Sequence, residues 1–257
     1  MARKKQKTTS YALRENRRLE QLVANNFRAI QEGPKKKKWS SHDLKCIKPL
    51  TAAQGDLFHA FFQGNHICAY GSAGSGKTFL GMYLALNEVL QGNQQQIIIV
   101  RSAVTTRDLG FMPGDLNEKM ALYEAPYKDI CAELVGRAST YADMKEAGVI
   151  SFMATSYIRG LTWDNAIILV EEGQNMSAHE INSIMTRVGQ NTRVIFTGDL
   201  IQTDLRKNSR DVSGMAGFLN IIARMDGFEA VEFTVHDIVR SEFVKSWIIA
   251  SEGYDYL

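Results

Sequence analysis

The stretch HICAYGSAGSGKTFL, residues 66–80, constrains the fold of this chain more than any other part of the sequence. It begins with an apolar run typical of a buried strand, and the residues after Thr78 have the spacing of an amphipathic helix. The loop between them fits the pattern G-x-x-x-x-G-K-[ST], with Gly71, Gly76, Lys77 and Thr78 at the fixed positions. Strand, loop and helix follow in the order that this pattern requires.

The chemistry of the loop suits a bound phosphate. Glycines let the backbone turn tightly, so that successive N–H groups point toward one anion, and the following helix adds its positive dipole end. Lys77 neutralises the outer phosphates, and the Thr78 hydroxyl can ligate magnesium. We therefore predict a nucleoside triphosphate site made of Gly71, Ser72, Ala73, Gly74, Ser75, Gly76, Lys77 and Thr78. The alternative is a glycine-rich turn with an unrelated lysine.

Composition favours a soluble globular protein. Hydrophobic residues make up 45% of the 257 residues and charged residues 23%, which are ordinary values for that class. The apolar runs are too short for a membrane span, and the N-terminus is too basic and polar for a signal peptide. Cys46, Cys68 and Cys131 are scattered, which favours a reducing compartment over a disulfide framework or a structural zinc. We expect a cytoplasmic protein.

Basic residues concentrate at the N-terminus. Residues 1–48 hold 14 Lys and Arg against 4 Asp and Glu, a net charge of +10, whereas the remainder holds 16 against 24, a net charge of −8. Two basic clusters, residues 3–7 and 35–38, flank a segment from Ser10 to Glu32 that has helical spacing of apolar residues. These apolar residues are Leu19, Leu22, Val23, Phe27 and Ile30. We expect a basic arm with one amphipathic helix and a basic linker.

Two interpretations of this arm stay open. Clustered lysines and arginines contact the phosphate backbone of single-stranded RNA or DNA without regard to sequence and in a salt-sensitive way. The alternative is a solvated tail whose helix docks on the body of the protein or on a neighbouring subunit. Trp39 is the only aromatic residue beside the lysine cluster.

From Pro49 onward, apolar runs alternate with helical patterns. We place a domain boundary there, with the basic arm at 1–48 and one α/β domain at 49–257. The predicted strands are 66–70, 97–101, 149–153, 166–172, 193–199 and 228–233. Helices are predicted over 51–63, after Thr78, after Asp115, and over 125–147, 177–188, 214–225 and 239–252. This alternation predicts a doubly wound parallel sheet flanked by helices.

Polar residues follow two of the predicted strands. Glu171 and Glu172 come after a core strand, where a P-loop enzyme needs one acid to hold magnesium and a second to orient or deprotonate the attacking water. Asp199 and Gln202 follow the strand 193–199, and side chains at that edge can sense the terminal phosphate. The alternative for the acid pair is two carboxylates that emerge from the core into solvent.

The order of several motifs resembles the PhoH family of P-loop ATPases over residues 48–252. The matching pieces are Gln54, GSAGSGKT (71–78), VRSAV (100–104), LGFMPGDLNEK (109–119), EEGQN (171–175), TRVG (186–189), TGDLIQTDL (197–205) and DIVRSEFV (237–244). The family is similar to the core of superfamily 1 helicases. The resemblance implies a RecA/helicase-like fold, ATP hydrolysis with Mg²⁺, homohexameric rings and association with RNA.

The resemblance also implies roles for single residues. Gln54 would bind adenine, and Lys77 with the rest of the loop would bind the phosphates. Thr78 and Glu171 would hold magnesium. The catalytic acid would be Glu172.

Three further residues complete the implied site. Gln202 would sense the γ-phosphate. Arg240 is the candidate arginine finger, delivered in cis or by the next subunit, and Arg159 is kept as an alternative for that role or for contact with nucleic acid.

Two features depart from the family. Glu171 stands where the family has aspartate, and its extra methylene either reaches magnesium through a small rotamer change or slows hydrolysis. Longer relatives carry an RNA-binding or nuclease-like domain beside the ATPase core, which this sequence does not show. A compact version of this kind suits a phage-borne gene.

Three functions follow as hypotheses. The first is a helicase-like ATPase that acts on single-stranded nucleic acid, with RNA favoured. The second is a ring-forming assembly or regulatory ATPase without motor activity. The third, a small-molecule kinase, needs a lid and an acceptor pocket that the sequence does not indicate, and the helicase-like motif order argues against it.

Overall fold

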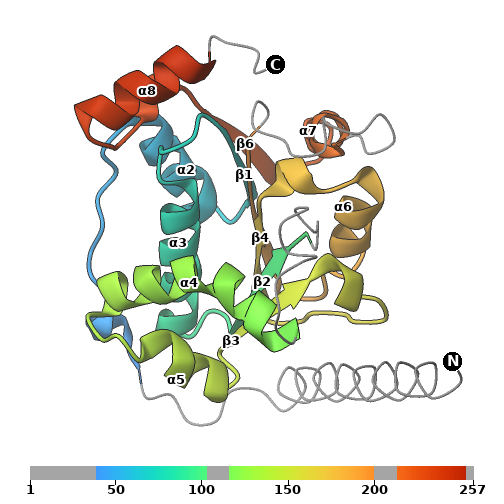
Figure 1. Cartoon of the computed structure of the whole chain (residues 1–257). Coiled ribbons are helices and arrows are strands. Elements are labelled where there is room, and N and C mark those ends of the chain that lie inside the picture. Colours follow the sequence, from blue (N-terminus) through green and yellow to red (C-terminus); the bar gives the residue numbers. More distant parts are fainter. Residues whose placement is uncertain (1–38, 103–115, 200–212, 253–257) are drawn as a thin grey trace, which may run out of the picture.

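The computed structural model describes residues 39–102, 116–199 and 213–252. Within these ranges, six parallel strands form one sheet that has helices on both faces (Figure 1). The predictions that fall outside them include the arm helix over residues 10–32, the sensor Gln202, and most of the motifs at 109–119 and 197–205. The α/β architecture predicted from the sequence is confirmed.

Each predicted strand is present, with bounds that differ by at most one residue. The strands are β1 (His66–Gly71), β2 (Gln96–Arg101), β3 (Ile150–Ala154), β4 (Ala166–Glu171), β5 (Arg193–Gly198) and β6 (Phe228–Phe233). Their order across the sheet is β3-β2-β4-β5-β1-β6. Because β5 lies between β1 and β4, the carboxyl ends of these three neighbouring strands open at one edge of the sheet.

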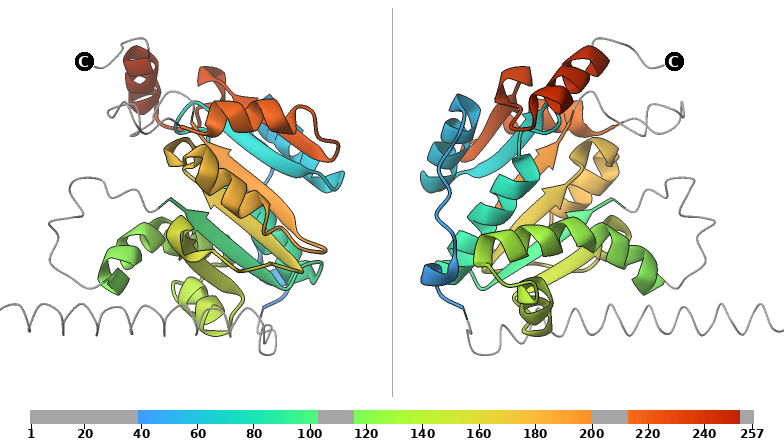
Figure 2. Two further views of the ribbon diagram at one scale, coloured as in Figure 1. Left: turned by 90° about the vertical axis from the view of Figure 1, so that its right-hand side faces the viewer. Right: turned by 60° about the vertical axis from the view of Figure 1, so that its left-hand side comes forward.

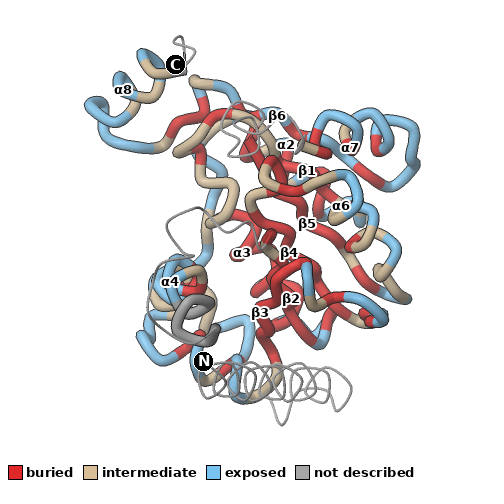
Figure 3. The backbone as a smooth tube through the Cα atoms, turned by 45° about the vertical axis from the view of Figure 1, so that its right-hand side comes forward, coloured by how far each residue is buried: buried red, intermediate tan, exposed pale blue. Residues whose placement is uncertain are grey.

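The strands are apolar throughout because both faces of the sheet are covered. Ile97 and Ile99 of β2 pack on one face, against the layer of helices α2 (Ala52–Phe62), α3 (Lys77–Gln91), α4 (Leu116–Val135) and α5 (Thr140–Glu146). Ile98 and Val100 alternate with them and pack on the other face, against α6 (Ala178–Met185) and α7 (Met215–Ile222). Figure 2 shows these two layers, and Figure 3 shows that the strands are the most buried part of the chain.

The helices of the described ranges agree with most of the predicted ones. They are α2 (Ala52–Phe62), α3 (Lys77–Gln91), α4 (Leu116–Val135), α5 (Thr140–Glu146), α6 (Ala178–Met185), α7 (Met215–Ile222) and α8 (Glu242–Glu252). Two predicted N-caps are confirmed: the Thr51 hydroxyl accepts from the Gln54 amide, and the Ser177 hydroxyl accepts from the Glu180 amide.

Several helix boundaries differ from the prediction. Helix α7 ends at Ile222 instead of residue 225, and α8 begins at Glu242 instead of residue 239. Two further differences have a visible cause. The helix expected over 125–147 is interrupted after Val135, where Gly136 takes a left-handed conformation (φ 78°). The helix expected to reach Val188 ends at Met185, because the next residues pair with another segment. The Trp163 amide donates to the Arg187 carbonyl, and Trp163 forms a parallel bridge with Val188.

The end of the basic linker packs on the body of the protein. Trp39 is 5% exposed and belongs to the core cluster that also contains residues of α3 and α4. The Lys45 amide donates to the Leu134 carbonyl of α4 over 2.8 Å. The predicted domain boundary after residue 48 stays a prediction, but residues 39–48 contact the α/β body. No helix of the described part of the chain has the length and hydrophobicity to cross a membrane.

Candidate functional site

The loop after β1 depends on glycine because the backbone of β6 lies against it. Gly71 has a φ of 112°, and a Cβ atom there would collide with the Phe233 carbonyl oxygen. That oxygen accepts a hydrogen bond from the Ser72 amide over 2.7 Å. Gly74 and Gly76 also have positive φ angles of 72° and 87°, and Gly76 is the N-cap of α3. These conformations curl the loop into the cradle that the sequence predicts.

Lys77 lies along the loop. Its Nζ donates to the carbonyl oxygens of Gly71 and Ser72, each over 2.7 Å, and contacts Ser75 Oγ at 3.3 Å. Ser75 Oγ in turn donates to the Ser72 carbonyl over 2.9 Å. The ammonium group is therefore held beside the mouth of the cradle, where it can meet the outer phosphates of a nucleotide.

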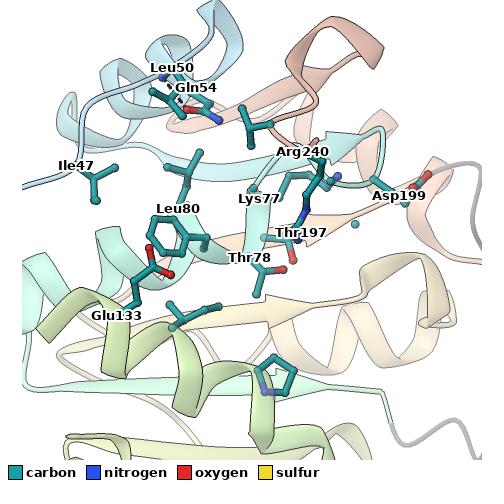
Figure 4. A pocket seen from close by; sticks show the side chains of 18 of the residues that line it. Ile47, Leu50, Gln54, Lys77, Thr78, Leu80, Glu133, Thr197, Asp199 and Arg240 are labelled. Carbon is teal, nitrogen blue, oxygen red and sulfur yellow. Dashed lines mark hydrogen bonds between the residues drawn. The ribbon is translucent and has the colours of Figure 1, made fainter. Parts of the chain in front are cut away.

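Gln54 joins α2 to the same loop. Its Nε2 donates to the Ser75 carbonyl over 3.1 Å, and its Oε1 accepts from the Leu50 amide over 2.8 Å (Figure 4). The side chain is 3% exposed and lines the cavity next to the loop. Contact with adenine stays a prediction; the observed hydrogen bonds give Gln54 a further role in fixing the shape of the loop.

Glu171 connects the start of α3 with the ends of β4 and β5. Its two carboxylate oxygens accept hydrogen bonds from Thr78 Oγ1 and Thr197 Oγ1, each over 2.8 Å. The residue is 2% exposed, and burial raises the pKa of its carboxyl group to about 7, although the two hydroxyl donors oppose the rise. Glutamate stands here where the family has aspartate, and its carboxylate contacts the Thr78 hydroxyl.

Glu172 follows in a left-handed conformation (φ 55°) and turns away from the strand. Its Oε2 accepts from Gln174 Nε2 over 2.7 Å, while Gln174 Oε1 accepts from the Asp199 amide over 2.9 Å. Gln174 is 5% exposed, so this bridge between the ends of β4 and β5 is shielded from solvent. A Cβ atom on the intervening Gly173 would overlap the Phe196 ring, which explains the glycine at that position.

Arg240 reaches the same cavity from the segment before α8. The Val239 amide donates to the Gly74 carbonyl over 3.1 Å, and Arg240 Cγ lies 3.1 Å from the position that a Gly74 Cβ would take. Figure 4 shows the Arg240 side chain beside Lys77 and Thr197. The candidate finger therefore lies at the nucleotide loop of its own chain. Arg159, the alternative, is exposed and is not among the residues that line this cavity.

These elements enclose a cavity of about 770 Å³ at the carboxyl edge of the sheet. Its lining includes Gln54, Lys77, Thr78, Glu172, Asp199 and Arg240, so the described residues that the sequence assigned to the site come together. Glu171 lies beneath it through its bond to Thr78. Gln202 lies outside the described residues.

Sequence reasoning missed three residues that shape this site. Gln174 and Thr197 hold the two glutamates, and Arg101 lies at the end of β2 in register with Glu171. Burial raises the pKa of the Glu171 carboxyl group, and the positive charge of Arg101 opposes that rise. Their positions at strand ends beside the acid pair were a signal, because parallel strands bring their carboxyl ends together.

The residues present fit a magnesium ion bound with a nucleotide. The Thr78 hydroxyl and the Glu171 carboxylate are oxygen ligands of the kind that Mg²⁺ prefers, and they lie 2.8 Å apart at the start of α3. Lys77 and the loop amides complement phosphate charge at the same point. The donor set therefore matches the predicted Mg²⁺–nucleotide pair.

The parallel sheet and this loop define a P-loop NTPase. A model of the PhoH-like protein family matches residues 46–252, and the chain belongs to that family. This confirms the resemblance drawn from the motifs. The family is one of ATPase-like P-loop proteins and implies nucleotide binding.

Curated relatives align with most of the chain. A PhoH-like protein of Bacillus subtilis (strain 168) is 34% identical over 212 residues, which cover 82% of this chain and 65% of the relative. A PhoH-like protein of Synechocystis is 33% identical over 209 residues, covering 81% and 63%. Protein PhoH of Escherichia coli (strain K12) is 32% identical over 203 residues, covering 78% and 57%. The matched part thus spans between 57% and 65% of the length of these relatives.

Glu171 should make the stability of the ligand-free protein depend on pH. Its carboxyl group has an ordinary pKa of 4.5 when unfolded and one of about 7 when folded. The folded state therefore loses stability as the pH rises from about 4.5 to about 7, because the unfolded chain releases the proton in this range while the folded protein still keeps it; above pH 7 the carboxyl group is ionised in both states. We expect the stability gained by Glu171→Gln over the unsubstituted protein to grow by about 2 kcal/mol between pH 5 and pH 8.

Urea unfolding at both pH values, without nucleotide or divalent metal, measures this difference. Glu180→Gln is the control: hydrogen bonds lower the pKa of Glu180, so that side chain is ionised in both states over most of the range. The difference in unfolding free energy between Glu180→Gln and the unsubstituted protein should stay nearly constant between the two pH values. A constant difference for Glu171→Gln as well would contradict the expected titration.

Proposed function

We propose that this protein binds ATP and hydrolyses it with Mg²⁺, as a helicase-like ATPase that acts on single-stranded nucleic acid, with RNA favoured over DNA. One observation carries the proposal: the phosphate loop, the Thr78–Glu171 pair, the Glu172–Gln174 pair and Arg240 surround a single cavity. A nucleotide held by the loop would present its terminal phosphate to Glu172 and Arg240.

Each side chain has a definable task in this reaction. Thr78 and Glu171 would hold Mg²⁺, which when bound neutralises charge on the terminal phosphates. Glu172 orients the attacking water and takes its proton, while the water oxygen bonds to the γ-phosphorus and the bond to the ADP oxygen breaks. Gln174 fixes the Glu172 carboxylate. Lys77 and Arg240 stabilise the negative charge of the transition state.

The nucleic-acid part of the proposal rests on charge. Residues 1–48 carry a net charge of +10, and 16 basic against 24 acidic residues follow. A basic arm beside an ATPase core suits a polyanionic partner that is bound through its backbone. The family likeness to helicase cores adds RNA as the favoured partner.

A second candidate is a ring-forming assembly ATPase without motor activity. The exposed apolar residues of α8 next to the phosphate loop favour it, because they offer a surface for a neighbouring subunit near the nucleotide. Nucleotide-dependent association without any effect of nucleic acid on turnover would support this candidate instead.

Addition of single-stranded RNA should raise the rate of ATP hydrolysis, and the stimulation should fade as salt is added, because backbone contacts release counterions. Steady-state turnover with RNA, with DNA of the same sequence, and with neither one measures this effect. The preparation needs a known oligomeric mass. Turnover that does not change across all three conditions and across salt would argue against a nucleic-acid-dependent ATPase.

Two substitutions separate binding from chemistry. Lys77→Ala should weaken ATP binding by about 10–100-fold, because a charged hydrogen-bond donor to phosphate is lost. Glu172→Gln should leave ATP affinity nearly unchanged and lower kcat by about 10²–10⁴-fold, because the general base is removed. Isothermal titration with ATP and a phosphate-release assay measure the two quantities. Hydrolysis at the unsubstituted rate in Glu172→Gln would overturn the assignment of that residue.

Gln174→Met should keep the packing and remove the bridge between Glu172 and Asp199. We expect kcat to fall by about 10–100-fold with ATP affinity within a few fold, because the lost bond ends on a carboxylate. Gln94→Met is the matched control, since Gln94 is 4% exposed but lies ahead of β2, at the opposite edge of the sheet. Equal effects of both substitutions on kcat would mean that Gln174 only contributes packing.

A further inference from the structure

Helix α8 exposes an apolar surface. It follows Arg240 and lies at one end of the molecule (Figure 1). Phe243 is 78% exposed and Trp247, one turn later, is 64% exposed. Val244 and Ile249 are 38% and 46% exposed. The other large exposed apolar residues of the described ranges are spread over several elements. Such residues are therefore most concentrated on α8.

Helix α8 makes few contacts with the rest of the described chain. Ile248 is the apolar residue that packs inward, with its Cδ1 3.2 Å from the position that a Gly74 Cβ would take. A helix of 11 residues is marginal in water unless tertiary packing supports it. A helix that turns two aromatic side chains outward therefore indicates a partner that covers them.

The same chain contains a second apolar stripe for which the sequence predicts a helix. Residues 10–32 place Leu19, Leu22, Val23, Phe27 and Ile30 at helical spacing among basic residues. We propose that the apolar face of α8, defined by Phe243, Val244 and Trp247, is the docking site for residues 10–32 of a second copy of this chain.

The position of residue 39 favours a second copy over the same chain. Trp39 is buried in the core cluster. The blue segment with which the described part of the chain begins lies at the end of the molecule opposite to α8 (Figures 1 and 2). Six residues, 33–38, separate it from the apolar segment, and even fully extended they span only about 20 Å. The segment thus starts near the end of the molecule that faces away from its own α8.

Charge supports the same pairing. The arm belongs to a region with a net charge of +10, whereas the rest of the chain has a net charge of −8. Glu242 begins α8 next to Phe243, and Lys245 is the basic residue that follows it on the helix. An amphipathic basic helix laid along this face would bury its apolar residues on Phe243 and Trp247, with its basic residues near acidic ones.

This contact is heterologous, because one surface of each copy meets a different surface of the next. Such contacts form a ring when the rotation between copies closes, and an open chain when it does not. Since α8 packs on Gly74, the docked arm would lie next to the phosphate loop of the neighbour. The proposal does not depend on ATP hydrolysis and is tested without nucleotide.

The oligomeric mass of the full chain tests it first. Sedimentation should show species larger than the 28.8 kDa monomer. Phe243→Ser with Trp247→Ser should raise the concentration needed for association by about 100-fold or more, because central aromatic residues carry most of an interface. Ile221→Ser with Met225→Ser is the control, since it removes two exposed apolar side chains elsewhere. A monomeric unsubstituted protein, or equal effects of both double variants, would overturn the proposal.

A mixing experiment identifies the occupant. Leu22→Ser with Phe27→Ser in the arm should give monomers, as should the α8 double variant. An equimolar mixture of the two retains one intact arm and one intact α8 face per pair, so it should form two-copy species and no larger ones. A mixture that stays monomeric, or arm variants that associate normally, would exclude the arm of a second copy as the partner.

Tryptophan fluorescence gives an independent measurement. Trp39 and Trp163 are buried, so Trp247 is the tryptophan that an added quencher can reach. Quenching by acrylamide should rise on dilution to monomers in the unsubstituted protein and should be insensitive to dilution in Trp247→Phe. Protection of Trp247 that persists in monomers would mean that the arm of the same chain covers α8, and would overturn docking by a second copy.

Discussion

The carboxylate of Glu171 joins three parts of the structure that are remote in sequence. Thr78 begins the helix after the phosphate loop, Glu171 ends β4, and Thr197 belongs to β5, and two hydrogen bonds of 2.8 Å hold them together without access to solvent. Burial opposes the charge, while the hydroxyls and Arg101 favour it. The position of the phosphate loop relative to the acid pair depends on this balance, because Glu171 links the loop helix directly to the sheet.

The sequence predicted the strands well because the sheet is covered on both faces. Continuous apolar runs such as 166–170 have few alternative structures once the loop after β1 implies parallel strands. Helix ends were less predictable. The end of α6 depends on pairing between Trp163 and Val188, which is a contact over 25 positions of the chain that no local pattern records. The break after Val135 depends on the conformation of Gly136, which a glycine permits but does not require.

The candidate site was predictable to the extent that its chemistry is carried by motifs. The motifs predict roles for Lys77, Thr78, Glu172 and Arg240, and these four residues line one cavity. Gln174 was not, because its importance comes from its two partners on different strand ends. Arg240 shows a limit of prediction from motifs. Its residue type indicates the chemistry of a finger. Its position at the cavity depends on the hydrogen bond between Val239 and Gly74, which no motif predicts.

Lys77 shows how a site of this kind can exchange its contents. Its ammonium group donates to the carbonyl oxygens of Gly71 and Ser72 of the same loop. An arriving phosphate therefore replaces two neutral acceptors with charged ones, and the departing phosphate leaves the lysine with its original partners. The carbonyl oxygens of the loop thus serve as alternative acceptors to the phosphate oxygens. Binding is an exchange of acceptors for one cation, so the net gain in free energy is smaller than for a lysine that had no partners in the protein.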